Sequence, residues 1–181
     1  MRILRPILIA LAISILALAA GCSSGPPKPH TYSLGERIEL GHVVYTVLET
    51  QWMSQLGSGV DARVPQNRFF LVRLNASGSG VSETPVPAMA VVDDDGNSYP
   101  ELTNGGDVPE WLGILRQAKP AEALQGNVVF DAPARHYKLR IGDESEEKIA
   151  FVDLPLTFTS STPELSMPAT QQPDERPVRN K

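Results

Sequence analysis

Hydrophobic and polar residues alternate along much of the middle of the chain. In residues 68–77 the large and small apolar side chains fall on one face: Phe70, Val72, Leu74 and Ala76. This period of two is typical of a half-buried β-strand. Residues 124–133 and 137–141 repeat the pattern, with inward positions at Leu124, Gly126, Val128, Phe130, Tyr137, Leu139 and Ile141. Residues 42–53 are rich in β-branched and aromatic residues, which also favours a strand. Residues 148–154 are interpreted as a strand whose inner face is not defined by the pattern.

Shorter stretches at 37–40, 88–92 and 97–99 add further strands, and Pro and Gly residues separate them. Many short strands divided in this way predict an all-β sandwich or barrel. We expect about seven or eight antiparallel strands and one short helix. Asp107 would cap that helix, with Glu110 in the capping-box position. Its inner face would carry Trp111, Ile114 and Leu115.

The amino terminus has a different pattern. Arg2 and Arg5 precede a run of 14 residues, 7–20, that is apolar except for Ser14. As a helix this run would span roughly 21 Å, which is short of the ~30 Å hydrocarbon core of a bilayer. A charged segment, a short apolar segment and then small residues predict a signal peptide, residues 1–21.

The only cysteine of the chain, Cys22, follows Ala19, Ala20 and Gly21. This arrangement resembles the bacterial lipobox, with Ala19 where Leu is usual. The resemblance implies cleavage between Gly21 and Cys22 and lipidation of the cysteine sulfur. Two or more acyl chains, at ~0.8 kcal/mol per buried CH₂, hold a protein firmly at a membrane. The alternative is an ordinary cleaved signal with a chance cysteine.

Composition divides the remainder into a tether (22–30), a β-domain (31–159) and a Pro-rich tail (160–181). Both flanking segments hold few large apolar side chains, so we expect the tail to be disordered. Ser23 stands where lipoproteins kept at the inner membrane carry Asp. The resemblance therefore points to the outer membrane if the host has one.

The net charge of the chain limits the classes of partner that it can bind. Loss of Arg2 and Arg5 with the leader changes the net charge from −5 to −7. An acidic surface argues against nucleic acid and against peripheral binding to anionic lipid. The lipid would then be the membrane anchor, and the domain would lie outside the cytoplasm. With Cys22 lipidated, no thiol is left for a disulfide or a metal.

Three segments together resemble a family of bacterial extracytoplasmic domains of unknown function. They are FFLVRLNASGSG, AVVDDDGNSYP and GNVVFDAPARHYKLRIGD, and the matching positions are Asn75, Gly78, Asp93, Gly96, Tyr99, Gly126, Phe130, Asp131, Pro133, Tyr137 and Leu139. The resemblance implies a telokin-like or immunoprotective-antigen-like immunoglobulin fold over about residues 34–156. The family commonly has Pro-Gly-Glu where this chain has Pro120, Ala121 and Glu122. Because Ala disfavours positive φ, we expect this turn to differ.

No motif predicts a cofactor or a metal site. The run Asp93, Asp94, Asp95 does not meet the spacing of an EF-hand loop, and Asp-Gly between strands favours a hairpin turn; an irregular cation site using these carboxylates is the alternative. The acid-rich run 142–148 is interpreted as another hairpin loop. The histidines, His30, His42 and His136, lack metal-ligand spacing. Methionine thioethers can bind copper, but Met53 and Met89 are interpreted as core residues and Met167 follows no motif. These methionines therefore argue against copper handling.

Residues 54–67 form the longest insertion between expected strands, and loops on a rigid sandwich often carry binding. Trp52 and Trp111 are candidate recognition residues if either is exposed beside this loop. In the alternative interpretation, Trp52 is the end of a strand and Trp111 lies on the buried face of the short helix. Residues 57–59 do not form a nucleophile elbow, and no catalytic triad can be assigned.

These observations predict a non-enzymatic lipoprotein whose domain is a protein-interaction or accessory module of the cell envelope, with a partner protein there. One alternative is a solute- or metal-binding lipoprotein, which needs a pocket between the sheets or an acid cluster. A second alternative is a hydrolase, which needs titratable residues that converge in a cleft.

Overall fold

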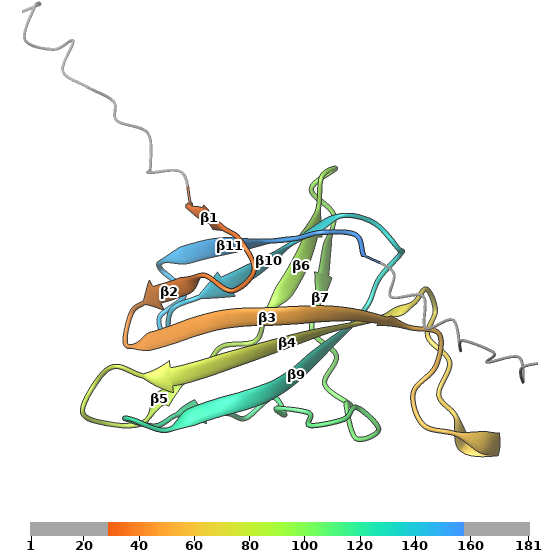
Figure 1. Cartoon of the computed structure of the whole chain (residues 1–181), viewed down its shortest axis with the longest axis horizontal. Coiled ribbons are helices and arrows are strands. Elements are labelled where there is room, and N and C mark those ends of the chain that lie inside the picture. Colours follow the sequence, from red (N-terminus) through yellow and green to blue (C-terminus); the bar gives the residue numbers. More distant parts are fainter. Residues whose placement is uncertain (1–28, 158–181) are drawn as a thin grey trace, which may run out of the picture.

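Two β-sheets face each other in the computed structural model, which describes residues 29–157 (Figure 1). The expected all-β sandwich is therefore confirmed. The predicted signal peptide, the predicted cleavage and lipidation site at Gly21 and Cys22, Met167 and the tail 160–181 lie outside the described residues.

The first sheet has five strands in the order β1-β11-β10-β6-β7. Their bounds are Thr31–Tyr32 (β1), Ala90–Asp93 (β6), Ser98–Pro100 (β7), Tyr137–Gly142 (β10) and Ile149–Leu154 (β11). β1 pairs with β11 in parallel, and the other neighbours are antiparallel. This parallel pair departs from the expected all-antiparallel arrangement.

The second sheet has four antiparallel strands in the order β2-β3-β4-β9. Their bounds are Arg37–Leu40 (β2), Val43–Met53 (β3), Phe69–Gly78 (β4) and Ala123–Asp131 (β9). A two-stranded sheet of β5 (Thr84–Pro85) and β8 (Gln117–Ala118) lies beside them. The described chain thus has eleven strands, and those that the sequence pattern missed are the two-residue strands β1, β5 and β8.

Alternation along the long strands builds the core between the two large sheets. The expected inward residues of β4 and β10 are all buried there, and so are Val128 and Phe130 of β9. Ala150, Val152 and Leu154 supply the inner face of β11. Leu124 is an exception, because it is only half-buried and lines a surface groove. Tyr137 is fully buried, and its hydroxyl donates to the Pro133 carbonyl at 2.7 Å.

A second, smaller core lies on the outer face of the four-stranded sheet. Its buried members are Leu56, Phe69, Leu71, Val108 and Val129. The segment 101–113 covers these side chains and adds Leu102 and Trp111 at their margin. Small clusters of this kind are usual beneath long loops. The outer face of this sheet is therefore partly buried rather than exposed to solvent.

The prediction of a helix after Asp107 is wrong. Glu110 has a φ of 47° and Gly113 a φ of 70°, which an α-helix does not allow. The backbone there bonds to a distant strand instead: Asn127 N–H donates to the Glu110 carbonyl and Leu112 N–H donates to the Asn127 carbonyl. The side chains of Ile114 and Leu115, expected on an inner face, are 42% and 97% exposed. The one helical turn in the described chain is a 3₁₀ turn at Gly59–Asp61.

We expected Ala121 to avoid a positive φ in the turn before β9, and this expectation is wrong. Ala121 has a φ of 56°, so an alanine adopts the left-handed conformation that glycine favours. The turn is closed by Glu122 N–H, which donates to the Lys119 carbonyl at 3.3 Å. The sequence thus keeps a positive-φ turn at this point without its usual glycine.

The strand directions define two ends of the sandwich. Because β1 is parallel to β11, the described chain begins at the end that holds the hairpin loop 143–148; we call this end the N-terminal pole. The turn at Gly41 and His42 lies there too, in contact with Glu144. β11 runs to the opposite end, the C-terminal pole, where Leu154 lies beside Tyr137. The connection 54–68, the turn 94–97 and the segment 132–136 are at this C-terminal pole (Figure 1).

Candidate functional site

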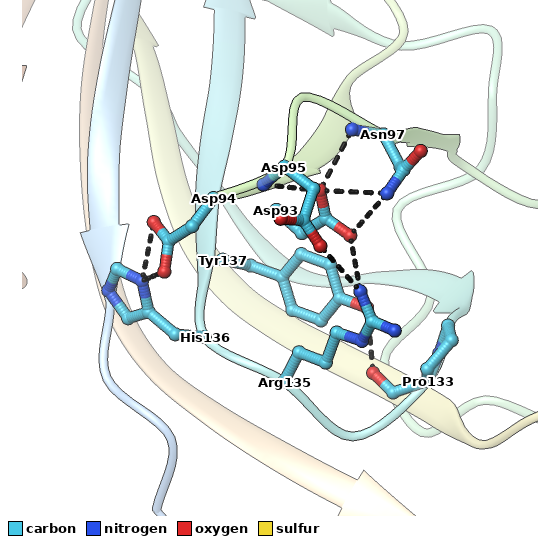
Figure 2. Close-up of polar contacts among 8 residues, drawn as sticks. All are labelled: Asp93, Asp94, Asp95, Asn97, Pro133, Arg135, His136 and Tyr137. Carbon is cyan, nitrogen blue, oxygen red and sulfur yellow. Dashed lines mark hydrogen bonds and ion pairs between the residues drawn. The ribbon is translucent and has the colours of Figure 1, made fainter.

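A cluster of polar side chains at the C-terminal pole is centred on Asp93, the last residue of β6 (Figure 2). Its Oδ1 accepts hydrogen bonds from the backbone N–H groups of Asp95 (3.1 Å) and Asn97 (2.8 Å). Its Oδ2 accepts from Asn97 Nδ2 at 2.9 Å and from Arg135 Nη1 at 3.2 Å. The Asp93 carboxylate is thus surrounded by donors of the protein itself.

These donors hold the pKa of Asp93 below its usual range, chiefly through the Asn97 side chain, with help from the two backbone N–H groups and Arg135; burial acts in the opposite direction. The carboxylate therefore stays charged and fastens the hairpin between β6 and β7. Gly96, with a φ of 85°, completes the turn. This is the hairpin turn that the Asp-Gly pair predicts.

The other two acids of the run point to different partners. Asp95 pairs with Arg135 at 3.1 Å, and Asp94 pairs with His136 Nδ1 at 3.1 Å (Figure 2). The three carboxylates do not converge on one point. Within residues 29–157, no three His, Cys, Asp or Glu side chains come together as a group that could hold a metal ion.

The three histidines lie in separate places. His136 lies between Asp94 and Asp153, whose Oδ1 is 3.0 Å from His136 Nε2, so it links the β6–β7 turn to β11. His42 pairs with Glu144 at the N-terminal pole, and this contact, after Glu144's own backbone, helps to lower the pKa of that carboxyl. His30 packs edge-on against Tyr32, with ring centroids 4.4 Å apart. The structure does not bring the histidines together.

Both tryptophans are half-buried, and both pack into the fold. Trp52, near the end of β3, stacks on Phe70 with ring centroids 4.2 Å apart and lies 6.2 Å from Tyr137. Trp111 packs against the second core, directly over Gly105, where a methyl group would collide with its ring. Neither ring belongs to the loop 54–67, so the structure gives both tryptophans a packing role. Met89 is buried in the main core and Met53 packs on the second core, as expected.

The loop 54–67 projects from the C-terminal pole between β3 and β4 (Figure 1). Paired backbone bonds between Leu56 and Arg63, at 2.9 and 2.8 Å, fix its base. Val60 and Val64 are 101% and 74% exposed, which is unusual for large apolar side chains. Sequence reasoning selected this loop but not these valines. The available signal was two valines in a segment that is mostly polar and small and has no alternation.

A second apolar feature lies beside the start of β9. Leu112, Ile114, Leu115 and Leu124 line a groove of about 440 Å³ there, with Lys119 among its lining residues. Leu115, at 97% exposure, projects freely. Nothing in the sequence pattern distinguished this groove, because Leu112, Ile114 and Leu115 come from a segment that was expected to be helical and Leu124 was expected to point into the core.

Comparisons with solved structures agree with the architecture. The chain is similar to the yjhA protein of Bacillus subtilis, with a TM-score of 0.52 and 13% identity over 68% of this chain and 99% of that chain. It is also similar to a secreted protein of Mycobacterium tuberculosis, MPT63, with a TM-score of 0.51 and 15% identity over 71% and 98% of the two chains. A third, an uncharacterized β-sandwich protein of Clostridium difficile, has a TM-score of 0.50 and 10% identity over 74% and 99%.

At these identities the likeness concerns the fold: this chain is a β-sandwich of the same general architecture. No protein-family model matches the sequence, and no curated protein matches it. Within the described residues, no helix is long and apolar enough to cross a membrane.

Proposed function

We propose that this chain is a membrane-anchored extracytoplasmic lipoprotein whose β-sandwich is a non-enzymatic protein-interaction module of the cell envelope. The observation that carries the proposal is the separation of the two poles. The described chain begins at the N-terminal pole, and the loop 54–67 projects from the other. Strands β3 and β4, of 11 and 10 residues, span roughly 33 Å between them. An anchor at Cys22 would therefore present that loop away from the membrane.

Two further observations support this reading. The similar β-sandwich MPT63 is a secreted protein, which fits a domain that works outside the cytoplasm. The bond from the Tyr137 hydroxyl back to the Pro133 carbonyl matches the tyrosine corner of immunoglobulin-like sandwiches. We therefore assign the domain to the immunoglobulin-like class, with the telokin-like family as its expected relative.

The non-enzymatic role rests on how the polar residues are used. Asp93, Asp94 and Asp95 are each paired within the protein, and the lowered pKa of Asp93 makes it a weak base at neutral pH. A hydrolase needs a nucleophile and a base that converge in a cleft. The polar cluster instead closes turns at the surface, a structural use that favours the interaction module.

The proposal is tested by following the lipid on the native protein. Cells that express the chain are fed an alkyne-labelled fatty acid, and the purified protein is examined by intact mass spectrometry. We expect a mature chain that begins at Cys22 and carries at least two acyl chains. The membrane fraction should contain it, and Cys22→Ser should abolish both the label and the membrane association.

A matched control moves the thiol into the folded domain. The double variant Cys22→Ser/Ser145→Cys keeps the same composition but places the cysteine in the hairpin loop 143–148, far from the apolar leader, so it should remain unlabelled. An uncleaved leader, or an unmodified thiol on mature protein, would overturn the anchoring. Crosslinking in intact cells then tests the interaction role: the same envelope partner must be captured through the loop 54–67 of the wild-type chain in repeated experiments.

A further inference from the structure

An asparagine followed by a glycine lies in the segment that covers the second core. Asn104–Gly105 is the only Asn-Gly pair of the sequence, and neither residue belongs to a strand. The Asn104 side chain is exposed, and its amide group forms no hydrogen bond with any residue of 29–157. The Gly105 N–H likewise donates to no acceptor in the described part of the chain. Because Gly105 has no Cβ, its nitrogen can approach the Asn104 side-chain carbon without steric hindrance.

Arg63 contacts the peptide group that joins these two residues. Its Nη1 donates to the Asn104 main-chain carbonyl, and its guanidinium lies 5.0 Å above the centre of the Phe69 ring. Paired backbone bonds to Leu56 fix the position of Arg63 at the base of the loop 54–67. The Asn104 carbonyl oxygen and the Gly105 nitrogen belong to one conjugated peptide unit. A cation on that oxygen therefore stabilises negative charge that develops on the unit, as a fixed donor does for an oxyanion.

We propose that Asn104 is a site of covalent modification, where Arg63 promotes spontaneous deamidation and directs it to isoaspartate. In the first step the Gly105 nitrogen loses its proton to hydroxide and attacks Asn104 Cγ. The new N–Cγ bond closes a succinimide ring, and Nδ2 takes a proton from water and leaves as ammonia, which regenerates the hydroxide. Because Arg63 stabilises the deprotonated peptide unit, it speeds this step.

In the second step water opens the ring at either of its carbonyls. Attack at Cγ breaks the new N–Cγ bond and leaves aspartate with the original backbone. Attack at the main-chain carbonyl breaks the bond from that carbon to Gly105 N, so the chain then continues through Cγ. The product is isoaspartate, in which the former main-chain carbonyl is a free carboxylate. Arg63 polarises this carbonyl and pairs with the carboxylate that it becomes, so Arg63 favours isoaspartate.

Two similar positions in the β6–β7 turn are held in unreactive arrangements. Asn97 is also exposed, but its Nδ2 donates to Asp93 Oδ2 at 2.9 Å, which fixes the side chain. Asp95–Gly96 has the composition that forms the same ring, but the Gly96 N–H donates to the Asp93 carbonyl at 3.0 Å. The turn therefore provides controls within the same molecule.

Isoaspartate at position 104 changes the surroundings of the loop 54–67. It adds one methylene to the backbone beside Gly105, where even an added methyl group would collide with the Trp111 ring. It also converts the Arg63 contact at the base of the loop into an ion pair. The modification therefore shifts the segment 101–113 on the second core. This inference goes beyond the proposed function and requires neither the lipid anchor nor a partner.

The test follows position 104 while the purified full-length chain is incubated at mildly alkaline pH. Digestion with a glutamate-specific protease releases residues 102–110 and, as the internal control, residues 84–101, which include Asn97. Mass spectrometry with electron-transfer fragmentation measures deamidation and distinguishes isoaspartate from aspartate. We expect position 104 to be converted, mainly to isoaspartate, while Asn97 remains an amide over the same period.

Arginine variants test the role of the guanidinium. Arg63→Gln should slow the conversion roughly tenfold and lower the share of isoaspartate, because it removes a charged donor. A variant that merely loosened the segment would react faster, so the direction of the change separates the two effects. Arg68→Gln changes the charge equally at an exposed position and should leave both the rate and the product ratio unchanged.

Unfolding removes the contact between Arg63 and position 104, so in concentrated urea the wild type and Arg63→Gln should react at equal rates. Melting temperatures confirm that each variant is folded without urea. The proposal would be overturned by an intact Asn104 in the incubated wild type, or by an Arg63→Gln rate equal to or above the wild-type rate. An unchanged product ratio in Arg63→Gln, or a difference in rate that persists in urea, would also overturn it.

Discussion

Glu101 and Arg116 form a bidentate ion pair inside the protein, and both side chains are 1% exposed. The distances are 2.5 Å between Nη1 and Oε1 and 2.9 Å between Nη2 and Oε2. Arg116 also donates to the carbonyls of Pro87 and Gly113, and Glu101 accepts from Met89 N–H at 3.1 Å. One buried pair thus fastens both ends of the segment that covers the second core.

We predict that Glu101→Gln lowers the free energy of unfolding by about 3–5 kcal/mol, because it leaves the buried Arg116 charge without a counter-charge. Urea unfolding followed by circular dichroism measures the change. The double variant Glu101→Leu/Arg116→Met should lose less, since it removes both charges together. The matched control is Arg37→Gln, which breaks an exposed pair with Glu39 and should cost less than about 1 kcal/mol. Equal losses for the two single variants would contradict a special role for the buried pair.

The second prediction concerns alkaline pH. Burial, then the neighbouring Tyr99 and Asp93, raise the pKa of Tyr137 to about 12. Because the folded state holds the proton more tightly than the unfolded state, this stabilisation is complete below about pH 10 and is lost as the pH rises towards 12. Tyr45, whose pKa is also raised by burial, adds to the loss.

Urea unfolding at several pH values from 8 to 11.5 should therefore show a smaller alkaline decline for Tyr137→Phe than for the wild type. At pH 8 the same variant should be about 1 kcal/mol less stable, because it lacks the hydrogen bond to Pro133. An alkaline decline identical to that of the wild type would show that Tyr137 does not titrate as described.

The third prediction uses the strained turn before β9. Ala121→Gly should relieve a left-handed conformation that costs an alanine about 1–2 kcal/mol, against a loss of about 0.5–1 kcal/mol from the flexibility of glycine. We expect a net gain of up to about 1.5 kcal/mol, seen as a higher melting temperature. Ala123→Gly, two residues on within β9, should instead lower the melting temperature. A lower melting temperature for both variants would show that the turn is not strained.

The fourth prediction compares two adjacent glycines. A methyl group at Gly105 would collide with the Trp111 ring, whereas one at Gly106 would meet nothing within 4 Å. Gly105→Ala should therefore cost about 1–3 kcal/mol, the usual range for overpacking, and Gly106→Ala should be close to neutral. Thermal unfolding reports the difference, and so does the intrinsic fluorescence of Trp111 measured in a Trp52→Phe background. Equal stability of the two variants would indicate that the covering segment moves easily from the sheet.

Local pattern was sufficient to find the long strands. Arg37–Leu40 was found with its observed bounds, and the inward faces of β4 and β10 followed from alternation alone. β5 and β8 were missed because a two-residue strand has no period to detect. The helix was wrong because Trp111, Ile114 and Leu115 have helical spacing, whereas backbone bonds to Asn127, far along the sequence, decide the actual conformation.

The surfaces were harder to predict for the same reason. Phe69, Leu71 and Val129 are buried on the outer face of a sheet only because a distant segment folds over them. The position of the Arg63 guanidinium, which donates to the Asn104 carbonyl and lies over the Phe69 ring, likewise depends on where those residues lie in space. The acidic turn, by contrast, could be predicted, since the donors that satisfy Asp93 come mostly from the next four residues.

The parallel pairing of β1 with β11 has a mechanical consequence. A pulling force applied to the two ends of the described chain would run along the strands and would load the contact of Thr31 with Phe151 and of Tyr32 with Val152 in shear. In shear, the bonds along a strand share the load and must break together, whereas a force across the strands would open them one at a time. If the domain were held at one end and pulled at the other, the pairing of β1 with β11 would be the first contact to resist its extension.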